Sequence, residues 1–166
     1  MAAAISTPGR LRQRAFTIIE LMITVVIVAI LASVAAPSMR DMLLTSKVRT
    51  AASDLYESVI LARSEAIKRV ANVEVAPISS DWKNGWTVQV GSTVLQSRDA
   101  TTDVLVAANT TGNIIYRLDG RISSDVRSLI FSSSNTSIAA RCVVMDASGR
   151  PGIKTDTDGN AANGCN

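Results

Sequence analysis

The feature that most constrains this chain is a run of nineteen residues, 21–39, that carries no formal charge. As an α-helix the run spans about 28 Å at ~1.5 Å per residue, close to the thickness of the hydrocarbon core of a bilayer. Glu20 lies at its upstream edge. Because a carboxylate beside lipid is costly, Glu20 is a candidate functional residue that needs a positive partner.

A basic leader precedes this run. Residues 1–15 contain Arg10, Arg12 and Arg14 and no acidic residue. A positive segment before an apolar stretch favours a cytoplasmic N-terminus and export of the downstream chain. Alanines, Ala35 and Ala36, also lie near the end of the run, so a cleaved secretory signal or a plain signal anchor is the simplest interpretation.

The order of residues at the junction indicates a more specific signal. Residues 15–22 read A-F-T-I-I-E-L-M and resemble the class III signal of type IV prepilins and type II secretion pseudopilins. The resemblance implies that a prepilin peptidase cleaves between Ala15 and Phe16 and that Phe16 is then N-methylated. It also makes Glu20 the fifth mature residue, the glutamate that this family uses in assembly. Ala15 departs from the glycine that is usual at this position.

Composition argues against several classes of function. The leader accounts for the whole net charge of +3, because 14 basic and 14 acidic residues remain without it. The chain contains no histidine, which excludes Ser-His-Asp and Cys-His catalysis and most zinc sites. No Walker loop, GxGxxG or HExxH motif is present. We expect no enzyme activity and no cofactor.

The C-terminal residues contain a pair of cysteines and an oxygen-rich turn. Cys142 and Cys165 enclose a 24-residue segment, and an intramolecular disulfide there would contribute ~3–4 kcal/mol in an exported head. Free thiols, or a bond to another chain, are the alternatives. Residues 156–160, D-T-D-G-N, have the oxygens of a calcium loop but lack the final glutamate of an EF-hand. An Asx-rich turn explains them, and no metal site is predicted.

One long helix is expected from Phe16 to about Val70. Residues 16–39 would form its membrane or filament-core segment, and residues 40–71 an amphipathic half that packs on a head domain comprising residues 40–166. The apolar face of that half recurs at spacings of three and four residues and consists of Val48, Ala52, Leu55, Val59, Ala62 and Ala66. Glu65 and Arg69 are spaced for an i,i+4 ion pair.

The remainder of the head, residues 72–154, is predicted to be rich in β-strands. Apolar and polar residues alternate over residues 86–90, and Gly91 begins a short hairpin loop before Val94. Turn dipeptides such as Asp119-Gly120 and Ser148-Gly149 separate the later candidate strands, which are residues 104–106, 113–118, 129–131 and 142–145. The predicted fold class is α+β, with an antiparallel sheet or two small packed sheets against the helix.

Two further segments resemble one pilin family. Residues 61–69, L-A-R-S-E-A-I-K-R, are similar to the end of the long helix in GspH/FimT-type pseudopilins. Residues 82–88, W-K-N-G-W-T-V, are similar to the family's W-x-x-G-W segment, whose tryptophans we expect in the core. The resemblance implies a type IV pilin-like fold, a long N-terminal helix packed on two antiparallel sheets.

The same resemblance implies a minor subunit, either of a type IV pilus or of a type II secretion pseudopilus. Gly149-Arg150 makes the FimT-like minor pilins of the pilus the closer match. The expected location is the bacterial inner membrane, crossed once with the head in the periplasm, and then the filament and its tip. The expected partners are the prepilin peptidase, the inner membrane, and other major and minor pilins through the N-terminal helix.

Some FimT-like proteins bind DNA during natural transformation through a C-terminal G-R-x-R motif. Here that motif reads G-R-P-G from Gly149, so the second arginine is missing, and Lys154 is a partial substitute. Arginines on loops suit sequence-independent contacts with phosphate. The candidate residues for double-stranded DNA are Arg121, Arg141, Arg150 and Lys154. A scattering of solvated charges explains the same residues equally well.

Overall fold

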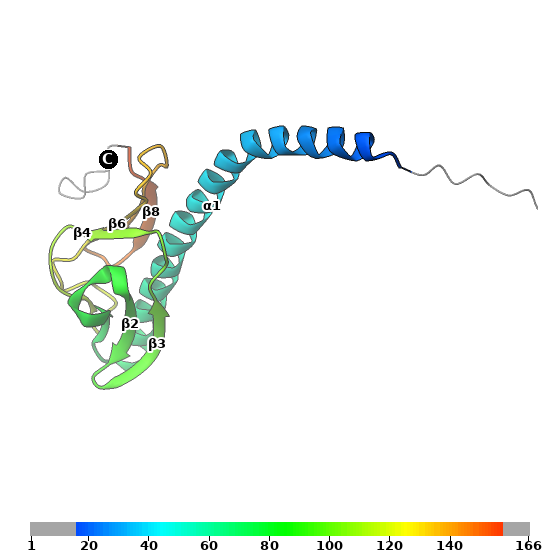
Figure 1. Cartoon of the computed structure of the whole chain (residues 1–166). Helices are drawn as coiled ribbons and strands as arrows, with labels where there is room; N and C mark the ends of the chain where they lie inside the picture. The colour runs from blue at the N-terminus through cyan, green and yellow to red at the C-terminus, as the bar shows by residue number, and fades with distance from the viewer. Residues whose placement is uncertain (1–15, 158–166) are drawn as a thin grey trace, which may run out of the picture. The chain divides into compact units, whose positions relative to one another are not determined.

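The computed structural model describes residues 16–157, and the leader, Ala15 and Cys165 lie outside the described residues. A single helix, α1 (Ile18–Arg69, 52 residues), is followed by two antiparallel sheets (Figure 1). The chain divides into two compact units, Met1–Met39 and Arg40–Asn166. The long helix and the α+β class that the sequence predicts are confirmed.

Among the described residues, no single helix is by itself long and apolar enough to cross a membrane. The segments Ile18–Ser33 and Ser38–Arg69, which are separated by a short break, have the length and composition of a membrane span when they are taken together.

The C-terminal end of α1 lies one residue before the predicted boundary. Val70 has a positive φ of 52°, and the N–H of Ala71 donates to the carbonyl of Ala66 at 3.2 Å. A left-handed residue followed by this six-to-one hydrogen bond is a Schellman motif. Glycine usually occupies the left-handed position because a β-branched side chain is unfavourable there. The motif ends the helix and turns the chain towards the first strand.

The first sheet has the strand order β3-β2-β1-β5. Its strands are β1 (Val73–Pro77), β2 (Gly85–Val90), β3 (Thr93–Asp99) and β5 (Ile114–Tyr116). The short turns η1 (Ile78–Ser80) and η2 (Trp82–Asn84) connect β1 to β2. All pairs are antiparallel, and the predicted hairpin at Gly91 joins β2 to β3.

The second sheet has the order β4-β6-β7-β8 and is also antiparallel. Its strands are β4 (Leu105–Ala108), β6 (Ser128–Ser132), β7 (Arg141–Met145) and β8 (Pro151–Thr155). The sequence did not predict β8. It is an edge strand with only half-buried or exposed residues, so it lacks the alternation of buried and polar positions that identifies a strand in sequence.

One hydrophobic core joins α1 to both sheets. All six residues of the predicted helix face are fully buried, with exposed fractions of 0–1%. They pack with side chains from the first sheet, such as Val75 and Trp86, and from the second, such as Phe131 and Val143. The rings of Trp86 and Phe131 meet edge to face, with centroids 6.2 Å apart. Trp82 and Trp86 are both buried, as predicted.

A buried hydrogen bond fixes the first sheet on the helix. The indole N–H of Trp86 donates to the hydroxyl of Ser58 at 2.9 Å. The Ser58 hydroxyl lies 2.8 Å from the carbonyl oxygen of Asp54 on the helix and 3.0 Å from Oε1 of Gln96, and these two acceptors share its one hydrogen. Ser58 is 0% exposed, so water cannot replace it as the acceptor.

We expect Ser58→Ala to lower the free energy of unfolding by roughly 1–3 kcal/mol, because it leaves the buried indole N–H without a partner. Ser64→Ala is the matched control. Its hydroxyl also bonds to the helix, donating to the carbonyl of Leu61 at 2.8 Å, but it is exposed. Denaturation of the detergent-solubilised protein, followed by tryptophan fluorescence, measures both. Equal losses in the two variants would contradict this role of Ser58.

Candidate functional site

The first candidate site is the start of α1, where Glu20 lies. One carboxylate oxygen of Glu20, Oε2, accepts hydrogen bonds from the backbone N–H and the hydroxyl of Thr17, both at 2.9 Å. The hydroxyl of Thr17 in turn accepts from the N–H of Glu20 at 3.2 Å. This reciprocal pair is a capping box, T-x-x-E, in which the two side chains satisfy backbone donors at the helix start. Sequence reasoning selected Glu20 and missed Thr17, although the spacing was readable.

The apolar residues that follow Glu20 have no cover within the chain. Every residue from 16 to 33 is exposed. The large apolar side chains from Phe16 to Leu31 are each 50–80% exposed. A hydrophobic surface of this size on all sides of a helix requires a lipid or protein environment.

The second candidate site is the junction of two turns that carry Arg121 and Arg150. The phenolic hydroxyl of Tyr116 donates to the carbonyl of Gly149 at 3.0 Å, and burial raises the pKa of Tyr116. A Cβ at Gly149 would lie 2.3 Å from the carbonyl oxygen of Gly120 and 3.4 Å from Cα of Arg121. The turns at 117–121 and 146–150 therefore touch, and they place both arginines at one end of the head.

Acidic side chains hold each of these turns in shape. In the first, Oδ1 of Asp119 accepts from the N–H of Arg121 at 3.1 Å. In the second, Oδ1 of Asp146 accepts from the hydroxyl of Ser148 at 2.6 Å and from the N–H of Arg150 at 2.9 Å. These hydrogen bonds hold the pKa of Asp146 below its usual range. Among the described residues, no ion pair includes Arg121 or Arg150, and both are exposed.

The other two DNA candidates do not join this junction. Arg141 pairs with Thr155 at the far end of the β7–β8 ladder, and its Nη1 donates to the Thr155 hydroxyl at 2.6 Å. Four residue steps along β7, about 13 Å, separate that end from Met145, which pairs with Pro151 beside Arg150. Lys154 pairs with Cys142, so it points to the opposite face of the sheet from Arg141.

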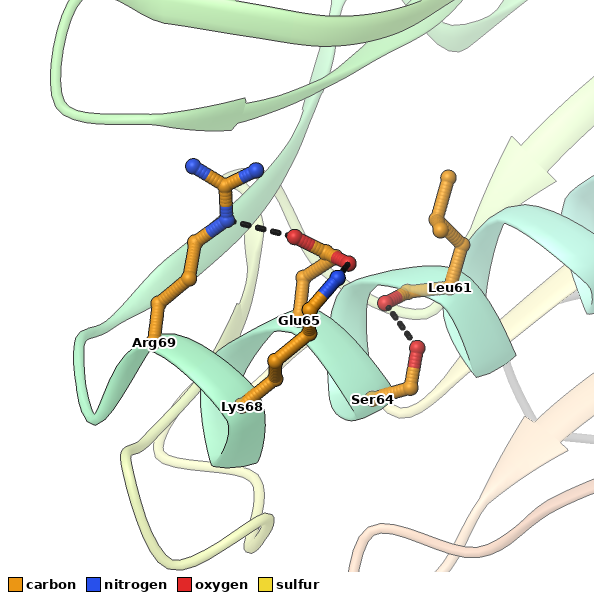
Figure 2. Close-up of polar contacts among 5 residues, drawn as sticks. All are labelled: Leu61, Ser64, Glu65, Lys68 and Arg69. Atoms are coloured by element: carbon orange, nitrogen blue, oxygen red, sulfur yellow. Dashed lines mark hydrogen bonds and ion pairs between the residues drawn. The ribbon is translucent and has the colours of Figure 1, made fainter.

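The end of α1 contributes a third arginine to the junction. Nε of Arg63 donates to the carbonyl of Gly120 at 3.1 Å. Two residues further along α1, Glu65 binds Arg69 at 2.5 Å and Lys68 at 3.4 Å (Figure 2), which confirms the predicted Glu65–Arg69 pair. The hydrogen bond from Arg69 lowers the pKa of Glu65. Glu65 partly neutralises these two cations. The positive charge of the junction therefore comes from Arg63, Arg121 and Arg150.

Two remaining predictions involve residues outside the described range, 16–157. Cys142 is fully buried in β7, but Cys165 lies outside the described residues, so their disulfide stays a prediction. The peptidase cleavage site also stays a prediction, because Ala15 lies outside them while Phe16 is exposed.

We expect Gly149→Ala to reduce the stability of the head by roughly 2–4 kcal/mol, from backbone strain at φ 79° and from overlap with the neighbouring turn. Gly91→Ala is the control. Gly91 also has a positive φ, 57°, but no atom lies within 4 Å of its added Cβ. The Gly91→Ala variant should lose only about 1 kcal/mol of stability. If thermal unfolding showed equal losses, the two turns would not be in tight contact.

Comparison with known proteins agrees with this architecture. The model of the family described as Type II transport protein GspH matches residues 51–149, and that of the prokaryotic N-terminal methylation motif matches residues 10–36. No curated protein matches the sequence. Two crystal structures of the type IV minor pilin FimU from Pseudomonas aeruginosa have the same fold. One shares 17% identity over 73% of this chain and 96% of FimU, with a TM-score of 0.58. The other shares 18% identity over 71% and 99%, with a TM-score of 0.56.

The methylation motif implies processing by a prepilin peptidase and assembly with other pilins. The N-terminal helix marks a membrane-anchored component of a pilus or pseudopilus. The GspH model covers more than half of the sequence, from the buried face of α1 to the glycine at the turn junction. The chain belongs to the GspH family of minor pilins and pseudopilins.

Proposed function

We propose that this protein is a FimT-like minor pilin of a type IV pilus, which takes part in assembly and priming through its N-terminal helix. The observation that carries the proposal is the uncovered apolar surface of residues 16–33, which begins at a single carboxylate. The inner membrane covers this surface before assembly. The apolar helices of other pilins cover it in the filament.

Glu20 favours assembly into the filament, because there its carboxylate can pair with a positive group of a neighbouring subunit. In the isolated chain the helix start satisfies its carboxylate through Thr17, but no described cation neutralises it. Cleavage before Phe16 creates a new amino terminus on every processed subunit. Pairing that amine of one neighbour with Glu20 neutralises both charges inside an apolar bundle and fixes the register of the two helices.

The charge of Glu20 can be separated from its capping role. We expect Glu20→Gln and Glu20→Ala to remove the subunit from filaments to the same extent, because neither side chain can pair with an amine. Glutamine at this position still completes a capping box. Thr17→Ala disrupts the cap at a cost of about 1 kcal/mol but keeps the charge, so it should still assemble. Immunoblots of sheared filaments and of membranes measure how much of each variant is in the filament and how much is in the membrane.

Normal incorporation of Glu20→Gln would contradict charge pairing and would assign Glu20 to helix capping alone. Equal membrane levels of all variants are required, since they show that each protein was made and inserted.

A type II secretion pseudopilus is the competing assembly. Deletion of the gene should abolish surface pili and leave enzyme secretion intact if the protein serves a pilus. Periplasmic accumulation of exported enzymes with normal pili would assign it to a secretion system instead.

Capture of double-stranded DNA is a second candidate function, favoured by the contact between the two arginine-bearing turns. Arg121 and Arg150 are exposed and outside the described ion pairs, and Arg63 is held on the same junction. Rigid turns position guanidinium groups for phosphate without sequence preference. The proposed DNA site at the junction therefore contains Arg121 and Arg150 of the four candidate residues, together with Arg63 of α1.

We expect Arg121→Ala combined with Arg150→Ala to weaken duplex binding and to lower the slope of log K against log salt by about 2. Arg141→Ala combined with Lys154→Ala removes the same charge away from the junction and should leave that slope almost unchanged. Fluorescence anisotropy of the full-length protein in detergent, titrated at several salt concentrations, measures both. Equal effects of the two pairs, or no binding by the unmodified protein, would contradict a DNA site at the junction.

A further inference from the structure

A cavity beside the end of β8 is lined by a buried carboxylate, by hydroxyl groups and by apolar side chains. It has a volume of about 290 Å³ and lies between the last residues of that strand and the loop that joins β6 to β7. Three of its lining residues, Thr136, Ala139 and Thr157, are exposed, so the cavity reaches the surface of the head. Asp156, by contrast, is only 3% exposed.

The charge of Asp156 has no partner within the described structure. Neither of its carboxylate oxygens has a hydrogen-bond partner, and no ion pair among residues 16–157 includes it. Lys154, on the same face of β8, is exposed and does not line the cavity. Arg141 donates to Thr155 instead. A buried carboxylate without a counter-charge is unfavourable, so the cavity favours a cationic ligand.

The hydroxyl groups of the lining indicate a cation that carries N–H donors. Ser132, Ser133 and Thr136 provide oxygens that accept hydrogen bonds. A metal ion fits poorly, since no group of three or more acidic, histidine or cysteine ligands occurs in the described part of the chain. A quaternary ammonium ion also fits poorly, because it binds in aromatic cages and no aromatic residue lines the cavity.

The apolar part of the lining indicates a cation at the end of an alkyl chain. Ile138 and Ala140 are buried, and Ala139 lies at the surface beside them. A lysine side chain combines an apolar stem, which such residues cover, with a compact ammonium that has three donors. Arginine needs acceptors for five donors in one plane, whereas this cavity has a single carboxylate.

The loop that forms the cavity is held in place without a ligand. The side-chain amide of Asn135 donates to Oδ1 of Asp41 on α1 at 2.8 Å, and its oxygen accepts from the N–H of Ser137 at 3.0 Å. The N–H of Asp156 donates to the carbonyl of Ala140 at 3.0 Å. The cavity is therefore formed in advance, and binding requires little ordering of the chain.

We propose that this cavity binds a primary alkylammonium group, which is supplied by a lysine side chain on the head of a neighbouring pilin. Asp156 pairs with the ammonium, hydroxyl groups accept its other N–H donors, and Ile138 and Ala140 contact the alkyl stem. Charge complementarity carries the choice of partner. The neighbouring subunit rests on the proposed function in a filament, whereas alkylammonium binding itself does not.

Titration of the full-length, isotope-labelled protein in detergent with n-butylammonium, which matches the lysine side chain, tests the cavity directly. The amide signals of Ala139 and Ala140 should shift with half-saturation near 1–10 mM, as expected for so small a ligand. Asp156→Asn should weaken binding at least about tenfold. Asp99→Asn is the control, because Asp99 is exposed at the end of β3 and should leave binding unchanged.

Butyltrimethylammonium separates charge from hydrogen bonding. It carries the same charge without N–H donors and should bind at least about tenfold more weakly than butylammonium. Equal binding of the two cations by the unmodified protein, or no saturable shift with butylammonium up to 50 mM, would overturn the inference. Both outcomes are read on the unmodified protein, so they stand whether or not Asp156→Asn folds.

A photo-crosslinking amino acid at the exposed position Ala139 identifies the occupant in sheared filaments. The expected product joins this protein to another pilin next to a lysine, and Asp156→Asn should lose most of it relative to the amount of subunit in the filaments. Saturable butylammonium binding without such a product would identify a free amine as the occupant and contradict the neighbouring lysine. Absence of the protein from filaments would instead contradict the proposed function, and the titration alone would then decide the alkylammonium site.

Discussion

The burial of one face of α1 against both sheets is the interaction on which the head depends. Residues 48–66 of the helix present small and branched side chains at spacings of three and four, and all of that face is buried. Small residues such as Ala52 and Ala62 let strands approach closely, and the Ser58–Trp86 hydrogen bond fixes where the first sheet sits. Each sheet alone would expose its inner face. The helix therefore organises the core of the head.

The distribution of apolar residues around the same helix is different before residue 40. Over residues 16–33 the apolar residues surround the helix on all sides and are exposed in the isolated chain. Only lipid or other apolar helices can cover such a surface, so the chain cannot act as a free soluble protein through this segment. Glu20 gives the segment its one charge, and the capping box with Thr17 keeps that charge at the helix start. Residues 48–66 of α1 thus belong to the core of a globular head, whereas residues 16–33 present an apolar surface that lipid or other helices must cover.

Periodic features could be predicted from sequence, and contacts between distant segments could not. The helix face, the Glu65–Arg69 pair, the hairpin at Gly91 and most strands follow from local spacing. β8 was missed because an exposed edge strand shows no alternation. The four basic candidates form a cluster in sequence, yet register puts Arg141 and Lys154 on opposite faces, and only Arg121 and Arg150 share a junction. The sequence predicts an Asx-rich turn at Asp156, whereas in the structure this residue is buried beside a loop about twenty residues earlier in the chain.

The most direct test of the account is the environment of residue 19 in the mature chain. A photo-crosslinking amino acid placed at Ile19, which is 68% exposed, can be activated in intact cells and in sheared filaments. The account predicts a crosslinked product with another pilin in the filament fraction, dependent on Glu20, and no such product while the subunit is held in membranes. Its absence from filaments carrying the protein would contradict the claim that this helix surface is covered by neighbouring subunits.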